Sequence, residues 1–258
     1  MALTSKSLFD LNGRLALITG SGQGIGLALA RGLAEHGASV VLNGRDAGKV
    51  ANAVTGLRDA GFTAHASVFD VTDFRAVDAD VGRIEAEIGA IDILINNAGV
   101  QFRAPLEDFP EEQWERLFKT NVSGAFHAGK AVARPMITRG KGKIINIGSV
   151  QSELARPNIA PYTATKGAIR NLTRGMCTDW AKYGLQINAI APGYFRTEMN
   201  QALVDNQEFS AWLEKRTPAG RWGYVDELIG AAVFLASDAS SFVNGHTLYV
   251  DGGMTASV

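Results

Sequence analysis

The sequence predicts a single α/β domain built on a parallel sheet with helices on both faces. Short apolar runs rich in Val and Ile recur along the 258 residues, and longer amphipathic stretches separate them. Such runs indicate buried strands, and their alternation with helical stretches is typical of a parallel sheet covered on both sides. A glycine-rich turn after the first strand favours the doubly wound topology, in which ligands lie at the carboxyl ends of strands.

Each expected element is a run of the right period that begins or ends near Gly, Pro, Asp or Ser. The seven expected strands cover residues 14–20, 39–44, 64–70, 91–99, 142–149, 185–193 and 246–253. Helices are expected near residues 24–37, 46–61, 73–89, 111–138, 160–184 and 224–237. Without a linker or repeat, residues 1–258 are expected to form one domain. The irregular insert 194–222 is interpreted either as a lid over a ligand or as a loop packed permanently on the core.

Composition narrows the class of protein. The chain is 46% hydrophobic and 20% charged, which is enough for a sizeable core, and its net charge of -1 gives no reason to expect nucleic acid. The single Cys177 excludes a disulfide framework, and the four histidines lack metal-ligand spacing, so no metal site is expected. Neither a signal peptide in residues 1–14 nor a membrane span is apparent, and we expect a cytoplasmic location.

The first strand leads into a turn whose glycines have separate uses. Gly20 allows the turn, Gly24 lets the backbone approach a pyrophosphate, and Gly26 lets the helix pack closely on the strand. Phosphate would then lie at the positive end of the helix. The same glycines also serve an ordinary tight turn, but the strand-to-helix context favours a dinucleotide site, contacted by Gly20, Ser21, Gln23, Gly24, Ile25 and Gly26.

The carboxyl end of the second strand reads Asn43, Gly44, Arg45, without the carboxylate that usually holds the ribose hydroxyls of NAD. A guanidinium is well suited to a 2′-phosphate, so the sequence favours NADP, with NAD use left open. Alternatively, Arg45 is a solvated charge paired with Asp46. Further contacts are expected at later strand ends, although each is also compatible with turn chemistry: Asp70, Val71, Asn97, Ala98 and Gly99.

Tyr162 lies four residues before Lys166 on an expected helix and follows Ser149 at a strand end. Residues four apart share a helix face, so the Lys166 ammonium can favour the ionised phenol. Lowering a pKa of about 10 by about three units requires roughly 4 kcal/mol, which one cation about 4 Å away supplies at an effective dielectric near 20. We therefore expect Tyr162 to act as a general acid-base, with Ser149 bound to the reacting oxygen; an exposed helical pair is the alternative.

With these motifs in this order, the chain resembles the short-chain dehydrogenase/reductase family over essentially its whole length. The resemblance implies a Rossmann-type seven-stranded sheet, a nicotinamide cofactor, usually a homotetramer, and a catalytic set that falls on Asn121, Ser149, Tyr162 and Lys166. It further implies that Asn121 holds a water linked to Lys166, that Lys166 also holds the nicotinamide ribose, and that Pro192, Gly193 and Thr197 contact the cofactor.

Longer segments, such as SVQSELARPNIAPYTATKGAI and APGYFRTEMN, are similar to family members that act on sugar acids. This similarity implies reversible oxidation of a hydroxyl group, generally with NADP. Gln23 departs from the pattern, because members that prefer NADP often carry Arg or Lys there, so Arg45 must provide most of the phosphate recognition.

A sugar-acid site needs a cation and several hydrogen-bonding groups. Arg103 is our candidate for the carboxylate, although it is equally compatible with a surface charge beside Glu107. Around Ser149 and Tyr162, the candidate hydroxyl partners are Gln151, Glu153 and Tyr194.

Two alternatives stay open. One is reduction of another ketone, such as a 3-oxoacyl thioester on a carrier protein. The other is a noncatalytic dinucleotide sensor, because the presence of catalytic residue types does not prove turnover.

Overall fold

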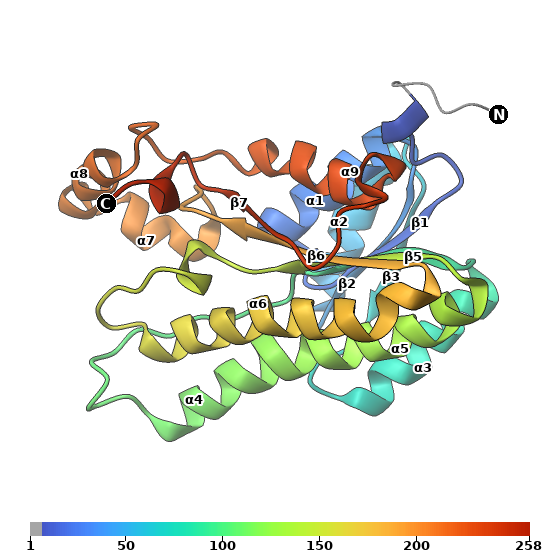
Figure 1. Ribbon diagram of the computed structural model, residues 1–258, viewed down its shortest axis with the longest axis horizontal. Coiled ribbons are helices and arrows are strands. Elements are labelled where there is room, and N and C mark those ends of the chain that lie inside the picture. Colours follow the sequence, from blue (N-terminus) through green and yellow to red (C-terminus); the bar gives the residue numbers. More distant parts are fainter. Residues whose placement is uncertain (1–6) are drawn as a thin grey trace.

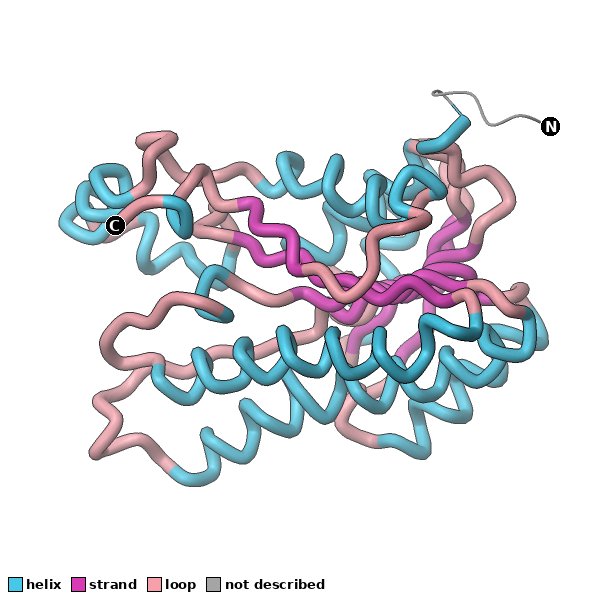
Figure 2. The backbone as a smooth tube through the Cα atoms, in the orientation of Figure 1, coloured by secondary structure: helices cyan, strands magenta, loops and turns pink. Residues whose placement is uncertain are grey.

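The computed structural model of the protein describes residues 7–258. Residues 1–6, which belong to the segment considered for a signal peptide, lie outside the described part. Within that part, seven strands form one parallel sheet in the order β3-β2-β1-β4-β5-β6-β7 (Figures 1 and 2). The order confirms the predicted doubly wound topology. The strands are β1 Leu15–Ile18, β2 Ser39–Gly44, β3 Ala64–Val68, β4 Ile91–Asn96, β5 Gly142–Ile147, β6 Leu185–Pro192 and β7 Thr247–Val250.

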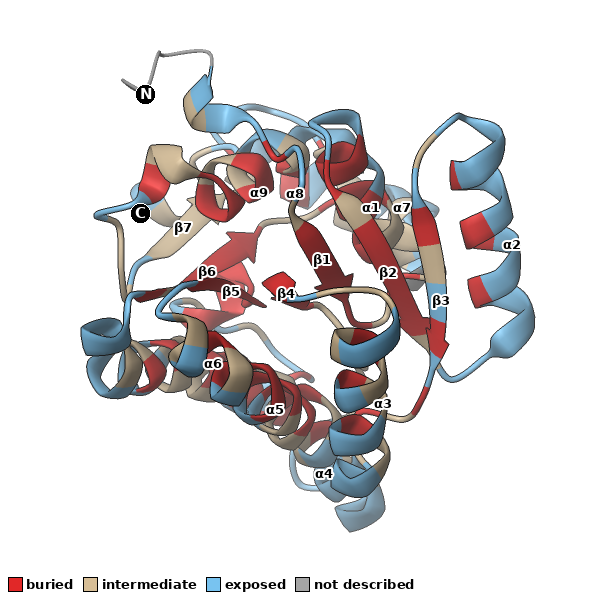
Figure 3. Cartoon of the chain, turned by 90° about the vertical axis from the view of Figure 1, so that its right-hand side faces the viewer, coloured by how far each residue is buried: buried red, intermediate tan, exposed pale blue. Residues whose placement is uncertain are grey.

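Two apolar cores lie on opposite faces of the sheet, so the central strands are buried on both sides. One face is covered by α1 (Gly24–Glu35), α2 (Ala47–Asp59) and α9 (Ile229–Ala236). The other is covered by α3 (Phe74–Glu87), α5 (Gly124–Arg139) and α6 (Ala160–Trp180). Figure 3 shows the two layers, with buried strands between them. The chain runs outward from β1 to β3 and then crosses to β4, so β1 and β4 flank the point where the strand order reverses.

The helix expected over residues 111–138 is interrupted. It consists of α4 (Glu111–Phe118), a π-helical turn over Lys119–Ser123, and α5. The turn contains Asn121, whose side-chain amide bonds the loop at Val100 in both directions. A π turn inside a helix frequently accompanies a functional site. Here it places a buried amide against the loop that follows β4.

The insert 194–222 contains more regular structure than the sequence indicated. It holds a 3₁₀ turn at Glu198–Asn200, α7 (Gln201–Val204) and α8 (Gln207–Arg216). Leu213 and Trp222 are buried, and they pack with Val150 and Met254 in a small third cluster. Apolar contacts with residues outside it therefore hold the insert against the rest of the domain.

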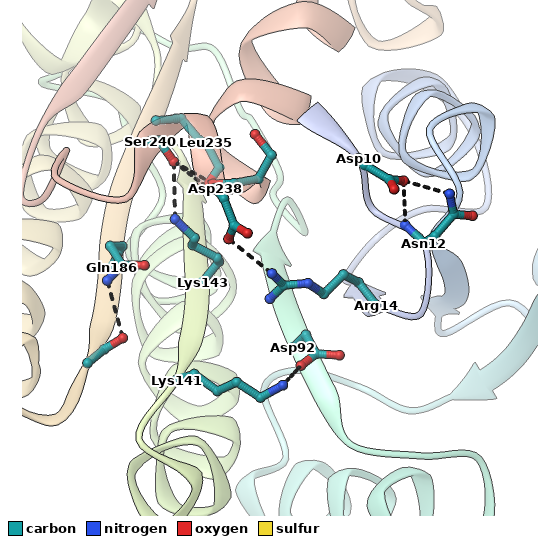
Figure 4. A network of polar contacts seen from close by, with 12 residues as sticks. Asp10, Asn12, Arg14, Asp92, Lys141, Lys143, Gln186, Leu235, Asp238 and Ser240 are labelled. Atoms are coloured by element: carbon teal, nitrogen blue, oxygen red, sulfur yellow. Dashed lines mark hydrogen bonds and ion pairs between the residues drawn. The ribbon is translucent and has the colours of Figure 1, made fainter. Parts of the chain in front are cut away.

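A polar network lies at the amino ends of the strands, opposite the carboxyl ends that carry the sequence motifs (Figure 4). Lys143 of β5 is 3% exposed, and its ammonium donates to Ser240 Oγ at 3.2 Å. Burial lowers the pKa of Lys143 to about 8, while the nearby Asp238 acts to raise it. Burial of the Lys143 ammonium is unfavourable, and Lys143 belongs to none of the predicted cofactor motifs.

Within residues 7–258 no helix combines the length and apolar character needed to cross a bilayer. The same residues contain no group of three or more His, Cys, Asp or Glu side chains arranged to hold a metal ion.

Candidate functional site

A cleft of about 340 Å³ lies at the carboxyl ends of the strands, where the strand order reverses. It brings together nearly all residues predicted to contact a dinucleotide, although they are distant in sequence. The predicted residues that line it are Gly20, Gln23, Gly24, Ile25, Gly26, Asn43, Arg45, Asp70, Val71, Asn97, Ala98, Gly99, Tyr162, Lys166, Pro192, Gly193 and Thr197. Ser21 is the exception among the predicted contacts.

The glycine turn has the strict steric requirements that the sequence indicated. Gly20 has φ +63°, and a Cβ there would lie 2.8 Å from Ala98 Cα. A Cβ on Gly26 would lie 2.6 Å from the Gly20 carbonyl oxygen, so only glycine lets α1 approach the turn this closely. Gly24 has φ +59° with open space beside it, at the beginning of α1. The turn therefore presents bare backbone and the N-terminus of α1 to the cleft, an arrangement suited to phosphate.

The segment after β4 braces this turn. Asn97 Nδ2 donates to the carbonyl oxygens of Thr19 and Gly20 at 3.0 and 2.8 Å. In return, Thr19 Oγ1 accepts from the backbone N–H groups of Asn97 and Ala98, both at 3.1 Å. These bonds couple two strand ends into one rigid wall of the cleft.

The side chains of two residues expected to contact the cofactor form hydrogen bonds within the protein. Ser21 is fully buried, and its hydroxyl donates to the Ile18 carbonyl at 2.7 Å. Asn43 Nδ2 donates to the carbonyls of Ser67 and Phe69, both at 3.1 Å. Ser21 therefore supports the turn from behind and does not line the cleft, whereas Asn43 lines the cleft with its amide already bonded.

Positive charge gathers where β2 ends. Arg45 is exposed and lies 3.7 Å from the Asp70 carboxylate across the cleft mouth. Burial acts to raise the pKa of Asp70, but hydrogen bonds from Thr72 and the charge of Arg45 hold it below its ordinary value. Lys49, which sequence reasoning missed, donates from Nζ to Gln23 Oε1. Its place in the first turn of α2, shortly after Arg45 in the sequence, is the signal that would have revealed it.

Ser149, Tyr162 and Lys166 meet on one wall of the cleft. Ser149 follows β5, whereas Tyr162 and Lys166 lie one turn apart on α6. Ser149 and Tyr162 share a side-chain hydrogen bond. Lys166 Nζ lies 5.6 Å from the centre of the Tyr162 ring and donates to the Ile147 carbonyl at 2.7 Å. The structure thus brings the predicted hydroxyl, phenol and ammonium groups together.

The protonation equilibria differ from the sequence-based expectation. Burial raises the pKa of Tyr162 to about 12, and the hydrogen bond with Ser149 only partly offsets this effect. Burial also lowers the pKa of Lys166 to about 8. The expected lowering of the phenol pKa by Lys166 is therefore not seen, because the ammonium lies under the ring and is itself desolvated. Arg103 and Arg156 are the cations that lower the pKa of Tyr162.

Asn121 lines neither this cleft nor the cavity described next. Its side chain is 3% exposed, and Nδ2 donates to Val100 O at 3.0 Å and to Thr165 Oγ1 at 3.1 Å. Thr165 Oγ1 in turn donates to the Tyr162 carbonyl at 2.7 Å. The side chain of Asn121 thus ties the loop after β4 to the helix that carries Tyr162.

A smaller cavity of about 60 Å³ adjoins the cleft and shares five lining residues with it: Gln101, Ser149, Tyr162, Gly193 and Asn200. Its other polar lining includes the predicted Arg103, Gln151 and Tyr194, and also Arg156, which sequence reasoning missed. Arg156 stands in a loop four residues before the helix, where no periodic pattern marks it.

Glu153 is not part of this cavity. Its carboxylate pairs with Arg170 and accepts from the Tyr249 hydroxyl at 3.2 Å. The structure therefore places Glu153 outside the cavity that holds the other predicted hydroxyl partners.

Comparisons with known proteins agree with this geometry. Residues 20–255 match the protein family described as Enoyl-(Acyl carrier protein) reductase. The chain is 61% identical over 256 residues to gluconate 5-dehydrogenase of Gluconobacter oxydans (strain 621H), covering 99% of this chain and 100% of the relative. It is 53% identical over 251 residues to 5-keto-D-gluconate 5-reductase of Escherichia coli (strain K12), covering 97% and 99%. A solved structure, gluconate 5-dehydrogenase from Burkholderia cenocepacia J2315 in complex with NADP and tartrate, is 62% identical with a TM-score of 0.97, covering 99% of this chain and 100% of the other.

Proposed function

The chain belongs to the short-chain dehydrogenase/reductase family, and from that premise we propose that it catalyses the reversible oxidation of D-gluconate to 5-keto-D-gluconate with NADP. The observation that carries the proposal is the position of Ser149 and Tyr162 on the wall shared by the long cleft and the small cavity. A reacting hydroxyl in the small cavity would face a proton acceptor on the same wall. Full-length relatives named for this reaction support the substrate.

The residues of the cleft fit a dinucleotide. The open backbone at Gly24 and the N-terminus of α1 would hold the pyrophosphate, while Asp70 and Val71 would border the adenine. Lys166 and the segment Pro192 to Thr197 lie at the other end, next to Tyr162. When bound, the nicotinamide supplies the hydride acceptor for oxidation and the hydride donor for reduction.

Arg45 and Lys49 support NADP over NAD. Arg45 lines the cleft just after β2, and Lys49 is bonded to Gln23, which also lines it. Neither position carries the carboxylate that favours an unphosphorylated ribose. A dianionic 2′-phosphate would find two cations there. The structure of the Burkholderia cenocepacia relative, which is in complex with NADP, agrees with this choice.

The proton moves through the protein side chains. During oxidation the ionised Tyr162 Oη would accept the proton of the substrate C5 hydroxyl while carbon C5 gives up a hydride to the bound nicotinamide. During reduction the neutral phenol would return a proton to the carbonyl oxygen. Ser149 bonds the same oxygen, and its hydrogen bond also acts to lower the pKa of Tyr162. We assign Asn121 the role of positioning α6 through Thr165.

We also propose a cytoplasmic homotetramer. Apolar side chains on the face built by α4 and α5 support an oligomer, since Trp114 and Phe126 are 45% and 44% exposed. Light scattering coupled to size-exclusion chromatography tests the assembly, and a monomer would contradict it.

The function is tested by following consumption of NADPH and NADH with 5-keto-D-gluconate. Turnover with NADPH, and a higher kcat/KM than with NADH, is the expected result. Acetoacetyl thioester serves as the competing substrate, and a strong preference for it would favour the 3-oxoacyl reductase alternative. Tight NADPH binding without turnover across a panel of polyols and ketones would instead favour a sensor.

A further inference from the structure

Two guanidinium groups without an opposite charge line the small cavity beside Tyr162. Arg103 follows β4 and Arg156 precedes α6. The Nε atoms of both are buried without a hydrogen-bond partner. Among residues 7–258 neither side chain forms an ion pair, and the one side-chain hydrogen bond of Arg103 goes to Gln101 at 3.2 Å. Buried, unpaired donors of this kind favour an anionic ligand.

The two loops that carry these arginines are joined. The Ala104 backbone N–H donates to the Asn158 carbonyl at 3.2 Å. Asn158 has φ +67°, a left-handed conformation that is uncommon for a residue other than glycine. The Arg156 guanidinium also stacks over the Phe209 ring of α8, 5.5 Å from its centre. The loop around Arg156 is thus bonded to the loop after β4, and its side chain packs on α8.

The charges of Arg103 and Arg156 are close enough to interact. Burial is the largest cause that lowers the pKa of Arg103, and the charge of Arg156 lowers it further. Both cations also lower the pKa of Tyr162. The nearest acid in sequence, Glu153, is engaged by Arg170 and Tyr249, so it does not neutralise Arg156.

We propose that Arg156 is a specificity-determining residue which, together with Arg103, binds the carboxylate of the substrate and selects sugar acids over neutral polyols. The inference rests on the proposed function and names how that same site recognises its substrate. A bound carboxylate supplies the missing opposite charge, and it satisfies the buried Nε donors of a planar fork. Because Arg156 stacks on Phe209 of α8, the insert contacts the guanidinium of Arg156 directly.

The test compares D-gluconate with D-glucitol, which carries a CH₂OH group where gluconate carries its carboxylate. We expect Arg156→Met to lower kcat/KM for D-gluconate by about 10- to 100-fold, mainly through KM. Its kcat/KM for D-glucitol should fall much less, because only the effect of Arg156 on the pKa of Tyr162 is lost there and no charge contact with the substrate. Arg156→Lys should recover part of the preference for the acid, since it restores the charge without the planar fork.

Two matched variants separate charge from packing. Phe209→Leu removes the stacked ring but keeps both cations, so it should retain the preference for the acid. Lys215→Met, which removes an exposed cation from α8 of the same insert, should match wild type. Equal losses on both substrates in Arg156→Met would show a structural role, and an unchanged KM for gluconate would also overturn the proposal. A wild-type protein inactive on D-gluconate would instead refute the proposed function, and with it this inference.

Discussion

Lys166 lies beneath Tyr162, with Nζ 5.6 Å from the ring centre, and its hydrogen bond goes to the Ile147 carbonyl at the end of β5. The lysine is therefore positioned by a strand end as well as by its spacing on α6. Burial of the ammonium lowers the pKa of Lys166 to about 8, and burial of the phenol raises the pKa of Tyr162 to about 12. The neighbouring Ser149 and the two arginines are what act to lower the phenol pKa in this structure.

Tyr162→Phe tests the proton transfer. The variant removes only the phenol oxygen, so we expect kcat to fall by about 10² to 10⁴-fold while NADPH affinity stays close to wild type. Turnover is measured by NADPH absorbance, and binding by fluorescence titration. Wild-type turnover in this variant would show that another group carries the proton. Tyr183→Phe, an exposed tyrosine at the other end of α6, is the control.

Ser149→Ala tests the hydrogen bond that acts to lower the pKa of Tyr162. Without that bond the phenol becomes a weaker acid, so the ionised form needed for oxidation appears only at higher pH. The rising limb of the pH profile for gluconate oxidation should therefore move upward, and kcat should fall. A lowered kcat with an unmoved limb would limit Ser149 to contact with the substrate. Ser241→Ala, at an exposed position, is expected to leave the profile unchanged.

Arg45→Met tests cofactor choice. Loss of one cation from the mouth of the cleft should raise the Kd for NADPH by about 10- to 100-fold, whereas the Kd for NADH should change little. Isothermal titration with both cofactors gives the ratio. Equal weakening of both would place Arg45 away from the 2′-phosphate. Arg31→Met removes an exposed arginine of α1 that pairs with Glu35, and should not alter either value.

Gly24→Ala tests the bare backbone of the turn. At φ +59° an L side chain is strained, and its methyl group would enter the space beside the turn, so we expect weaker binding of both cofactors and a lower melting temperature. Gly56→Ala is the control, because it lies inside α2 with open space around it and a helical backbone. A fully retained Kd in Gly24→Ala would show that the cofactor does not approach this residue.

Lys143→Met tests the buried ammonium at the other end of the sheet. Its pKa is about 8 in the folded protein against an ordinary 10.5, so between these values the unfolded chain binds more protons and stability rises with pH. Below pH 8 the charged form costs stability, and we expect the variant to be about 1 to 3 kcal/mol more stable at pH 7. Urea unfolding at pH 7 and pH 10 measures this gain, which should shrink as pH rises. A constant gain would point to packing, and exposed Lys182→Met is the control.

The succession of strands, the doubly wound order and the family were all predictable because periodicity and glycine placement are local signals. The single helix expected over residues 111–138 was wrong in detail, since the π turn at Asn121 depends on a bond to Val100. Glu153, predicted to contact the substrate, is paired with Arg170, which only folding brings near.

The sequence by itself determined the architecture, the glycine turn and the spacing of Tyr162 and Lys166, because each depends on residues close together in the chain. Only the tertiary structure decided the direction of the pKa shifts, the bracing of the turn by Asn97, and the meeting of Arg103 with Arg156. Burial and the distance between charges arise from segments that are remote in sequence, so no local pattern contains them.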